Sequence, residues 1–315
     1  MQKPLNMILK KHHFSATLTV SVLLLFSACG SLSSSQKQNT HNDSFPAFSY
    51  EGHRGARGLY PENSIGAMKI AIDLPKVTTL EMDCHITKDK KVIVYHDHYL
   101  NPKFVQYTDG TPLSGKDDKG ILYEYNYADL AQFDIGSKFY EDYPEQQNVP
   151  TPIALLSDLI DEAEDYAKEK RNTPMFYNIE TKSTQGKDNE YHPDPKEFSD
   201  LLLQVVIDKG IASRTVIQSF DKRTIQYIHR TYPQIKTSYL IGGNNKKNIA
   251  EIVDELGYTP FIISPNYSLV TPEFIKEAHH AGMKVIPWTV NDKKEIEKLE
   301  SFHVDGIISD YPNLF

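Results

Sequence analysis

The sequence predicts an α/β protein of the TIM-barrel type, in which eight parallel strands are each followed by a helix. Short apolar runs alternate with amphipathic stretches from residue 49 to residue 315. The length of this region is close to the roughly 250 residues that such a barrel needs. Hydrophobic residues make up 39% of the chain and charged residues 24%, a balance that argues against a disordered or multi-spanning membrane protein.

Nine segments have the character of strands, one more than the barrel needs: residues 50–54, 79–86, 92–96, 176–181, 215–220, 237–241, 261–264, 285–289 and 306–309. Only residues 87–91 separate the second segment from the third, whereas a parallel pair needs a crossover of about a dozen residues or more. We therefore expect an antiparallel hairpin. With Asp89 and Lys90 as its turn, Asp83 would lie opposite His96.

Helices are predicted between the strands from capping residues and from apolar residues at helical spacing. Asn63, Asp221 and Asp292 each precede such a stretch, and Thr271 precedes a proline that would open another. The longest helix is expected over residues 153–170, where apolar residues recur every three or four positions.

A long segment, residues 97–150, interrupts the alternation. It is rich in Tyr, Asp and Gly and too long for a plain connection between two elements. We therefore expect a small insertion after the third strand, over the active-site end of the barrel. Its aromatic residues would form a small core of their own; the alternative is a surface for a partner.

The N-terminal residues have the order of a signal peptide. Lys10 and Lys11 precede an apolar run that ends in small residues and is short for a transmembrane helix of about 20 residues. We expect residues 1–28 to be removed. Residues 25–29 (LFSAC) resemble the lipobox of bacterial lipoproteins, in which the cysteine, here Cys29, is acylated. The alternative is an ordinary cleavage site in which Cys29 has no role.

Residues 31–44 form a polar stretch that cannot bury a core, and we expect residues 29–48 to be a flexible, lipidated tether. The tether would hold the domain, residues 49–315, at a membrane of the bacterial cell envelope, facing the periplasm or the surface. The chain has two cysteines, and the second, Cys84, is expected to be a reduced thiol. The net charge of −8 argues against binding of nucleic acid, which requires a basic surface.

Polar side chains crowd the carboxyl ends of the predicted strands, where TIM barrels place their active sites. They are His53 and Arg54 at the end of the first segment, Glu81 and Asp83 on the second, His96 and Asp97 at the end of the third, Glu180 and Lys182 at the end of the fourth, and Trp288 on the eighth. Residues two apart on a strand face the same side, so Glu81 accompanies Asp83, and Glu180 accompanies Lys182.

Three inward carboxylates, on Glu81, Asp83 and Glu180, would raise one another's pKa unless a positive charge neutralised them. One divalent cation, Mg²⁺ or Ca²⁺, meets this need because both ions prefer oxygen ligands. The alternative is a solvated rim in which Lys182 pairs with one acid. Two acid-bearing strand ends together with two histidines favour the cation.

His53 and His96 are left for proton transfer, because imidazole suits softer metals than an all-oxygen site does. Two imidazoles, one as base and one as acid, suit a displacement at phosphorus in which one oxygen is deprotonated and another leaves. Arg54 supplies a planar guanidinium that matches phosphate oxygens.

These motifs resemble the glycerophosphodiester phosphodiesterase family, a branch of the phosphatidylinositol phospholipase C-like barrels. In chain order they are 52–56 (GHRGA), 61–64 (PENS), 80–83 (LEMD), 87–89 (TKD), 94–97 (VYHD), 178–182 (NIETK), 218–221 (QSFD), 287–291 (PWTVN) and 305–312 (DGIISDYP). The similarity covers about residues 49–315, and the combination of motifs is highly specific.

The resemblance implies metal-dependent hydrolysis of a small-molecule glycerophosphodiester to glycerol 3-phosphate and an alcohol. Similar enzymes use the neighbouring glycerol hydroxyl as an internal nucleophile and pass through a cyclic phosphate. The implied roles are acid–base catalysis by His53 and His96, cation binding by Glu81, Asp83 and Glu180, phosphate contact by Arg54 and Lys182, and a pocket wall formed by Trp288.

Two other functions fit the same residues. One is a phospholipase C- or D-like activity on lipids or lysolipids, which a membrane-tethered enzyme would meet. The other is a surface lipoprotein that binds a partner and keeps the barrel without catalysis, because a fold does not fix a function.

Overall fold

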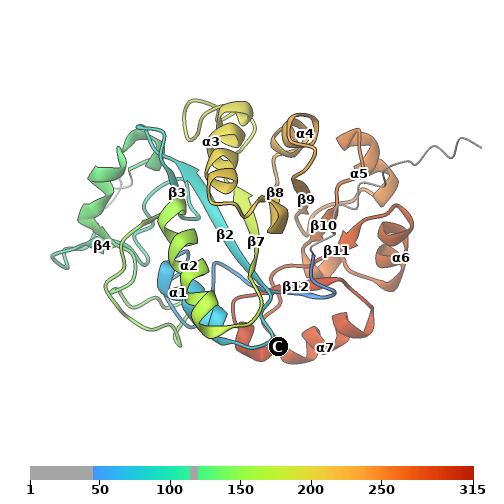
Figure 1. The fold of residues 1–315 in the computed structure, drawn as a ribbon, viewed down its shortest axis with the longest axis horizontal. Coiled ribbons are helices and arrows are strands. Elements are labelled where there is room, and N and C mark those ends of the chain that lie inside the picture. Colours follow the sequence, from blue (N-terminus) through green and yellow to red (C-terminus); the bar gives the residue numbers. More distant parts are fainter. Residues whose placement is uncertain (1–44, 114–119) are drawn as a thin grey trace, which may run out of the picture. The chain divides into compact units, whose positions relative to one another are not determined.

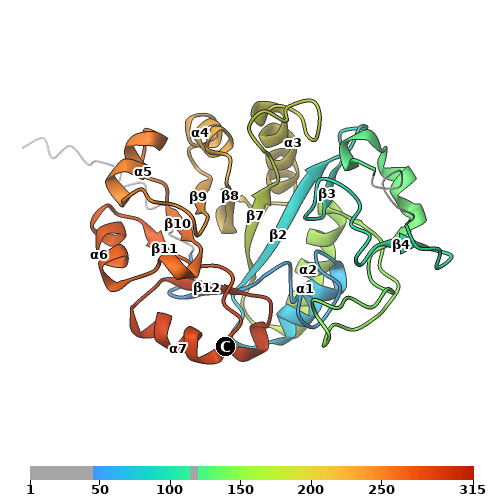
Figure 2. The ribbon, with the colours of Figure 1, turned by 180° about the vertical axis from the view of Figure 1, so that it is seen from behind.

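A computed structural model describes residues 45–113 and 120–315. In this part of the chain eight parallel strands form a barrel in the spatial order β11-β10-β9-β8-β7-β2-β1-β12 (Figures 1 and 2). The two ends of the sheet meet through backbone hydrogen bonds, such as the bond from Ile308 N–H to the Pro287 carbonyl (3.0 Å). The predicted α/β barrel is confirmed. The expected signal peptide, Cys29 and most of the tether lie outside the described residues.

The barrel strands are β1 (Ser49–Gly52), β2 (Thr79–Ile86), β7 (Phe176–Thr181), β8 (Thr215–Ser219), β9 (Lys236–Ile241), β10 (Ile262–Pro265), β11 (Lys284–Val285) and β12 (Gly306–Ser309). The helices are α1 (Ile65–Asp73), α2 (Leu156–Lys170), α3 (Pro195–Asp208), α4 (Lys222–Thr231), α5 (Ile249–Leu256), α6 (Pro272–His280) and α7 (Lys293–Ser301). Figures 1 and 2 show these helices around the outside of the strands. Asp221, Thr271 and Asp292 cap α4, α6 and α7 as predicted.

The outer half of β2 forms the predicted antiparallel hairpin with β3 (Val92–Val94). Its register differs by one residue from the predicted one. Asp83 lies opposite Tyr95, whose N–H donates to the Asp83 carbonyl (2.9 Å). The predicted pairing of Asp83 with His96 is therefore wrong.

A longer turn causes this difference in register. Thr87 N–H donates to the Lys91 carbonyl (2.9 Å), so that three residues stand between them rather than two. The Thr87 hydroxyl donates to Asp89 (2.6 Å) and accepts the Lys91 N–H (2.9 Å). Lys90 takes up the left-handed conformation (φ 61°) that the three-residue turn requires.

Two helices begin later than predicted. The N-cap of α1 is Ser64, whose hydroxyl accepts the Ala67 N–H (3.0 Å), and not Asn63, which is left-handed (φ 55°) and turns its side chain toward β2. The helix expected from residue 153 begins at Leu156, because β6 (Ala154–Leu155) instead pairs with β3.

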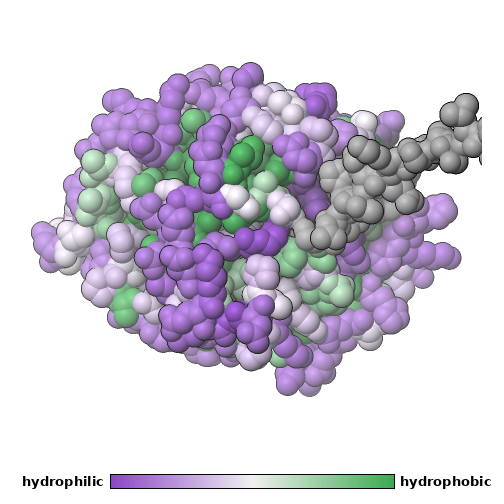
Figure 3. Space-filling model, viewed as in Figure 1, coloured by the Kyte–Doolittle hydropathy of each residue, from purple (hydrophilic) through white to green (hydrophobic). Residues whose placement is uncertain are grey.

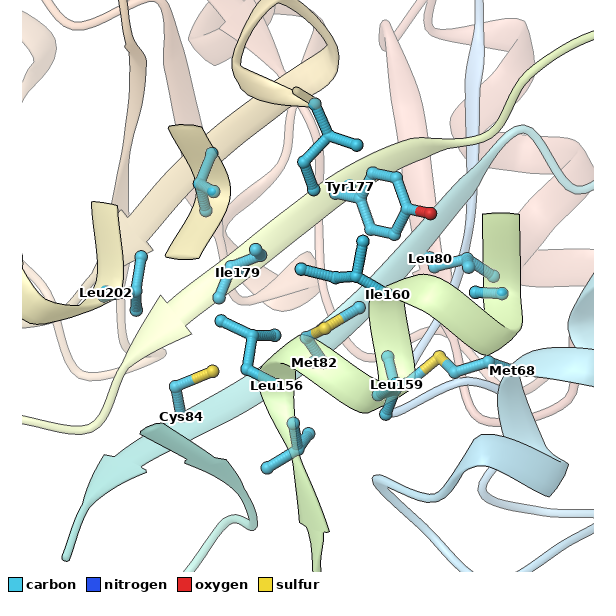
Figure 4. Packing of buried hydrophobic residues seen from close by; sticks show 14 of the residues in the cluster. Met68, Leu80, Met82, Cys84, Leu156, Leu159, Ile160, Tyr177, Ile179 and Leu202 are labelled. Atoms are coloured by element: carbon cyan, nitrogen blue, oxygen red, sulfur yellow. The ribbon is translucent and has the colours of Figure 1, made fainter. Parts of the chain in front are cut away.

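The outer faces of β2 and β7 are apolar and pack against α2, as Figure 4 shows. Leu80, Met82 and Cys84 alternate along β2 with Glu81 and Asp83, and all five side chains are buried. Because alternate residues point to opposite faces of a strand, the apolar side chains pack against the helices while the acidic side chains point into the barrel. The Cys84 thiol is free and lies in this outer layer.

The long segment after β3 has its own small core, as expected. Its short strands β4 (Gln106–Tyr107) and β5 (Phe133–Asp134) pair with each other, and aromatic residues such as Phe104 and Tyr140 stack within it (5.0 Å between ring centroids). Figures 1 and 2 place β4 on the side of β3, away from α5 and α6.

The face of the molecule in Figure 3 is mostly hydrophilic, with hydrophobic residues visible between polar ones. In the described ranges the exposed large apolar side chains are Tyr99, Phe139, Ile207, Phe220 and Tyr267. No helix in these ranges has the length and apolarity needed to cross a membrane.

Candidate active site

A cavity of about 230 Å³ opens where the barrel strands end. Its lining includes seven of the residues predicted from the sequence: His53, Arg54, Glu81, His96, Glu180, Lys182 and Trp288. The eighth predicted residue, Asp83, is buried on β2 beside Glu180 of β7 in the strand register. The structure thus brings all eight together, from strands that are far apart in the sequence.

The loop after β1 turns sharply so that His53 and Arg54 both face the cavity. A side chain at Gly52 would place its Cβ 2.0 Å from the Gly55 carbonyl oxygen, and Gly55 itself has φ 85°. Only glycine tolerates both conditions without strain. Arg54 is also left-handed (φ 51°), and its backbone N–H donates to Glu81 Oε2 (2.8 Å).

Glu81, Asp83 and Glu180 form a buried cluster in which one ligand atom of each lies within 4.8 Å of the others. Burial raises the pKa of Glu81 well above its ordinary value, and the nearby Asp83 raises it further. Burial also raises the pKa of Glu180 to about 7. Three carboxylates that cannot all ionise in isolation, and that offer only oxygen, are the donor set that Mg²⁺ or Ca²⁺ prefers. The residues fit a divalent cation.

Two positively charged side chains, Arg54 and Lys182, neutralise part of this negative charge. Arg54 Nη1 lies 2.7 Å from Glu62, and its Nε lies 3.1 Å from Asp83 Oδ2. Lys182 Nζ lies 2.9 Å from Glu180 and 3.7 Å from Asp83. Burial alone would raise the pKa of Asp83, but Arg54, Lys182 and the two histidines together outweigh burial and hold that pKa well below its ordinary value.

A buried aspartate holds His53 in place. This residue is Asp310, whose Oδ1 lies 2.5 Å from His53 Nδ1. Its Oδ2 accepts hydrogen bonds from Asn291 Nδ2 (2.7 Å) and from the Tyr143 hydroxyl (3.1 Å). Burial lowers the pKa of His53, and Asp310 opposes that change. His53 Nε2 is left facing the carboxylate cluster, 3.9 Å from Glu81.

His96 is held in the same way. Its Nδ1 lies 2.7 Å from Asp97 Oδ1, and Asn101 donates to the second oxygen of Asp97 (2.7 Å). The imidazole of His85 also contacts the His96 carbonyl oxygen (3.0 Å). Each histidine therefore has Nδ1 on a carboxylate and Nε2 available in the cavity.

Trp288 and Phe220 form an apolar wall of the cavity. Their rings meet edge to face, 5.4 Å between centroids, and the Trp288 indole N–H donates to the Ser264 carbonyl (2.9 Å). Phe220 remains 44% exposed. An exposed aromatic ring at a cavity mouth is available to contact a bound molecule.

Two residues of the site were not predicted from the sequence: Asp310, which directly follows β12, and Gln218, which donates to Glu81 Oε1 (2.8 Å). Both positions were visible as polar residues at the end of a predicted strand. Asn63 makes two hydrogen bonds to Asp83, from its amide N–H₂ to Oδ2 (2.9 Å) and from the Asp83 backbone N–H to its Oδ1 (3.1 Å). It braces the cluster.

Residues 53–314 match the glycerophosphoryl diester phosphodiesterase family. The chain belongs to this family. A glycerophosphodiester phosphodiesterase of Bacillus subtilis is 28% identical over 268 residues, covering 84% of this chain and 83% of that one. A human lysophospholipase D is 46% identical over 48 residues, only 15% of each chain.

Solved structures of the phosphodiesterase family have the same fold. A putative glycerophosphoryl diester phosphodiesterase from Silicibacter pomeroyi gives a TM-score of 0.75 at 27% identity, covering 86% of this chain and 92% of that one. An Oleispira antarctica phosphodiesterase, solved in complex with the product sn-glycerol-3-phosphate, gives a TM-score of 0.66 at 21% identity, covering 86% and 96%.

Replacing Asp310 with asparagine is expected to lower kcat roughly 100-fold and to leave cation affinity unchanged. The donors from Asn291 and Tyr143 would hold the amide oxygen, so the amide N–H₂ would face His53 Nδ1 and move the imidazole proton to Nε2. Steady-state kinetics and calorimetry measure the two effects. Asp292→Asn, at the N-cap of α7 where asparagine caps equally well, is the control. Unchanged kcat in the Asp310 variant would contradict the orienting role.

Proposed function

We propose that this phosphodiesterase hydrolyses glycerophosphodiesters to glycerol 3-phosphate and an alcohol, with one divalent cation and two histidines. The observation that carries the proposal is that His53 and His96 line one cavity with Glu81 and Glu180, two of the three clustered carboxylates. Each imidazole has Nδ1 held by an aspartate, and neither Nε2 accepts or donates a hydrogen bond within the described residues, the arrangement that a proton-transfer pair needs.

The first step is an internal displacement. The glycerol hydroxyl next to the phosphodiester attacks phosphorus, and one histidine accepts the proton of that hydroxyl. A new P–O bond forms to glycerol, the P–O bond to the alcohol breaks, and the other histidine protonates the departing oxygen. An adjacent hydroxyl has a high effective concentration, which makes this route favourable.

The second step opens the cyclic phosphate with water. The histidine that lost its proton now accepts one from water, and the other returns a proton to the glycerol oxygen, so both imidazoles recover their starting states. The product is glycerol 3-phosphate. We propose that Arg54 and Lys182, which line the cavity, bind the phosphoryl oxygens throughout.

We propose that Glu81, Asp83 and Glu180 hold Mg²⁺ or Ca²⁺. A bound cation supplies positive charge that stabilises the phosphoryl oxygens as negative charge develops on them. Lys182 contacts two of these carboxylates, and it would be released toward the substrate when the cation neutralises them.

Cation affinity is expected to fall as the pH falls below about 7. Burial raises the pKa of Glu180 to about 7, so below that pH this carboxyl holds a proton that the cation must displace. Each displaced proton weakens apparent affinity about tenfold per pH unit. Calorimetry between pH 5.5 and 8, in buffers of different ionisation enthalpy, measures both affinity and proton release. An affinity independent of pH would contradict the raised pKa.

A comparison of soluble and lipid substrates tests the substrate class. We expect the protein to release glycerol 3-phosphate from glycerophosphocholine with a kcat/KM well above that for lysophosphatidylcholine in micelles, because the cavity of about 230 Å³ suits a small diester. The short match to a lysophospholipase D supports the second candidate, activity on lysolipids. Turnover of lysophosphatidylcholine without turnover of glycerophosphocholine would contradict the proposed glycerophosphodiester activity and favour activity on lysolipids.

We further propose that the chain is a lipoprotein of the bacterial cell envelope, anchored through Cys29. The basic, apolar and small-residue order of residues 10–29 supports this, and so does the polar stretch that follows. Incorporation of labelled fatty acid into the protein in cells, lost in Cys29→Ser, is the expected result. Equal labelling of the variant would contradict the anchor.

A further inference from the structure

A chain of buried side chains runs through the barrel interior to one of the proposed cation ligands. Asn178 Nδ2 donates to Glu51 Oε2 (2.8 Å) and to Gln218 Oε1 (3.1 Å). Gln218 Nε2 donates to Glu81 Oε1 (2.8 Å). All four residues are at least 98% buried. The chain links Glu51, which does not line the cavity, to Glu81, which does.

The direction of these hydrogen bonds is set at the Glu51 end. Burial raises the pKa of Glu51 to about 7, and above that pH its ionised carboxylate only accepts, so Asn178 turns its N–H₂ group toward Glu51. The same N–H₂ group occupies Gln218 Oε1, which leaves Gln218 Nε2 to face Glu81. Asn178 Oδ1 is buried and has no hydrogen-bond partner among the described residues. The Asn178 amide therefore keeps this orientation although it leaves a buried acceptor unsatisfied, which costs free energy.

Glu51 is itself fixed from the other side. The Ser49 hydroxyl donates to Glu51 Oε1 (2.8 Å) and shares a second hydrogen bond with Thr79 Oγ1 (2.8 Å). The side chains of these three residues all point into the barrel from β1 and β2. Within the described residues no Lys or Arg forms an ion pair with Glu51, and its hydrogen-bond donors, Ser49 and Asn178, are neutral.

Glu81 consequently receives one N–H on each oxygen. Gln218 donates to Oε1, and the Arg54 backbone N–H donates to Oε2 (2.8 Å). A carboxylate oxygen has two lone pairs, so each oxygen keeps one for another partner. Groups behind a metal ligand that fix its orientation commonly change metal affinity 10- to 100-fold when they are altered.

We propose that Glu51, acting through Asn178 and Gln218, is a positioning residue that keeps an N–H donor on Glu81 and so orients this carboxylate for the cation. The inference rests on the proposed function, in which Glu81 is a cation ligand. It extends the functional residues to a second layer in the barrel interior, on β1, β7 and β8.

The test is cation affinity of the full chain, measured by calorimetric titration with Mg²⁺ and with Ca²⁺. Gln218→Met removes the donor to Glu81, and Glu51→Met removes the acceptor that orients Asn178. Each is expected to weaken binding about tenfold or more. Glu51→Gln keeps a carbonyl acceptor for Asn178 and an N–H₂ group for Ser49, so it is expected to bind within about threefold of the wild type.

The control is Gln226→Met on α4, whose half-buried amide donates to the Leu256 carbonyl (2.9 Å) away from the cavity. It should bind the cation like the wild type. Circular dichroism and the Tm without cation show which variants are folded. If Glu51→Met does not fold, Gln218→Glu, which turns an acceptor toward Glu81, takes its place and should bind still more weakly than Gln218→Met.

The outcomes separate this inference from the proposed function. Wild-type affinity in Gln218→Met would overturn the positioning role alone. Equal loss in Glu51→Gln and Glu51→Met would also overturn it, because charge rather than hydrogen-bond direction would then matter. A wild-type chain that binds neither Mg²⁺ nor Ca²⁺ would overturn both the positioning role and the proposed cation site.

Discussion

Replacing His53 and His96 together with alanine is expected to lower kcat at least about 1,000-fold while cation affinity stays within about threefold of the wild type. A positioned general acid or base contributes about 100- to 10,000-fold, and the effects of residues that act together do not add. The two imidazoles are held by Asp310 and Asp97, and His53 Nε2 lies 3.9 Å from Glu81, so neither histidine is one of the three residues that would hold the cation. Steady-state kinetics and calorimetry on the same preparations measure both quantities.

His229→Ala is the matched control for the histidine variants. His229 stacks on Tyr258 (3.8 Å between ring centroids) and does not line the cavity, so its loss should leave kcat unchanged. A double variant of His53 and His96 with full activity would contradict the acid–base assignment. Loss of activity together with loss of cation binding would also contradict it, because the histidines would then serve the cation site.

Glu81→Ala is expected to weaken cation binding at least about 100-fold and to reduce activity to the same extent at low cation concentration. It removes one of three carboxylates from the cluster, and the remaining Asp83 and Glu180 are already paired with Arg54 and Lys182. Hard divalent cations depend on the number of charged oxygen ligands for their affinity. Activity should return in part when excess Mg²⁺ or Ca²⁺ is supplied.

Glu162→Ala is the control for this variant, since Glu162 is an exposed acid on α2 that pairs with Lys69 (2.7 Å). It should change neither cation affinity nor kcat. Unchanged cation affinity in Glu81→Ala, measured by calorimetry on the folded variant, would contradict the proposal that the carboxylate cluster binds the cation.

The barrel and its polar strand ends were predictable because period-two alternation is local information. On β2, apolar Leu80 and Met82 alternate with Glu81 and Asp83, and the structure separates the two sets onto opposite faces. The strand ranges 79–86, 176–181 and 306–309 agree with the structure at both ends. Once the strands are placed, the side chains at their carboxyl ends must meet.

Features that depend on side-chain hydrogen bonds were harder to predict. The hairpin register differs by one residue because the Thr87 hydroxyl closes a three-residue turn. Asn63 has the residue type of a helix cap but donates a hydrogen bond to Asp83 on β2, while Ser64 caps the helix. In both cases the hydrogen bonds of one polar side chain, which the alternation of apolar and polar residues does not reveal, decided the conformation.

Long-range partners in the site were missed for the same reason. His53 and Asp310 are separated by 257 positions and meet only because β1 and β12 are neighbours that close the barrel. The contact of Tyr143 with Asp310 likewise joins the long insertion to the barrel.

The helices α3 and α5 were not predicted, although Asp194 and Asn248 cap them.

The most direct test of the central claim is release of glycerol 3-phosphate from glycerophosphocholine by the full chain, before and after chelation and after Mg²⁺ or Ca²⁺ is restored. We expect turnover that chelation abolishes and that one of the two cations restores. Turnover that survives complete removal of divalent cations would contradict the role assigned to Glu81, Asp83 and Glu180. Absence of turnover with either cation would contradict glycerophosphodiester hydrolysis itself.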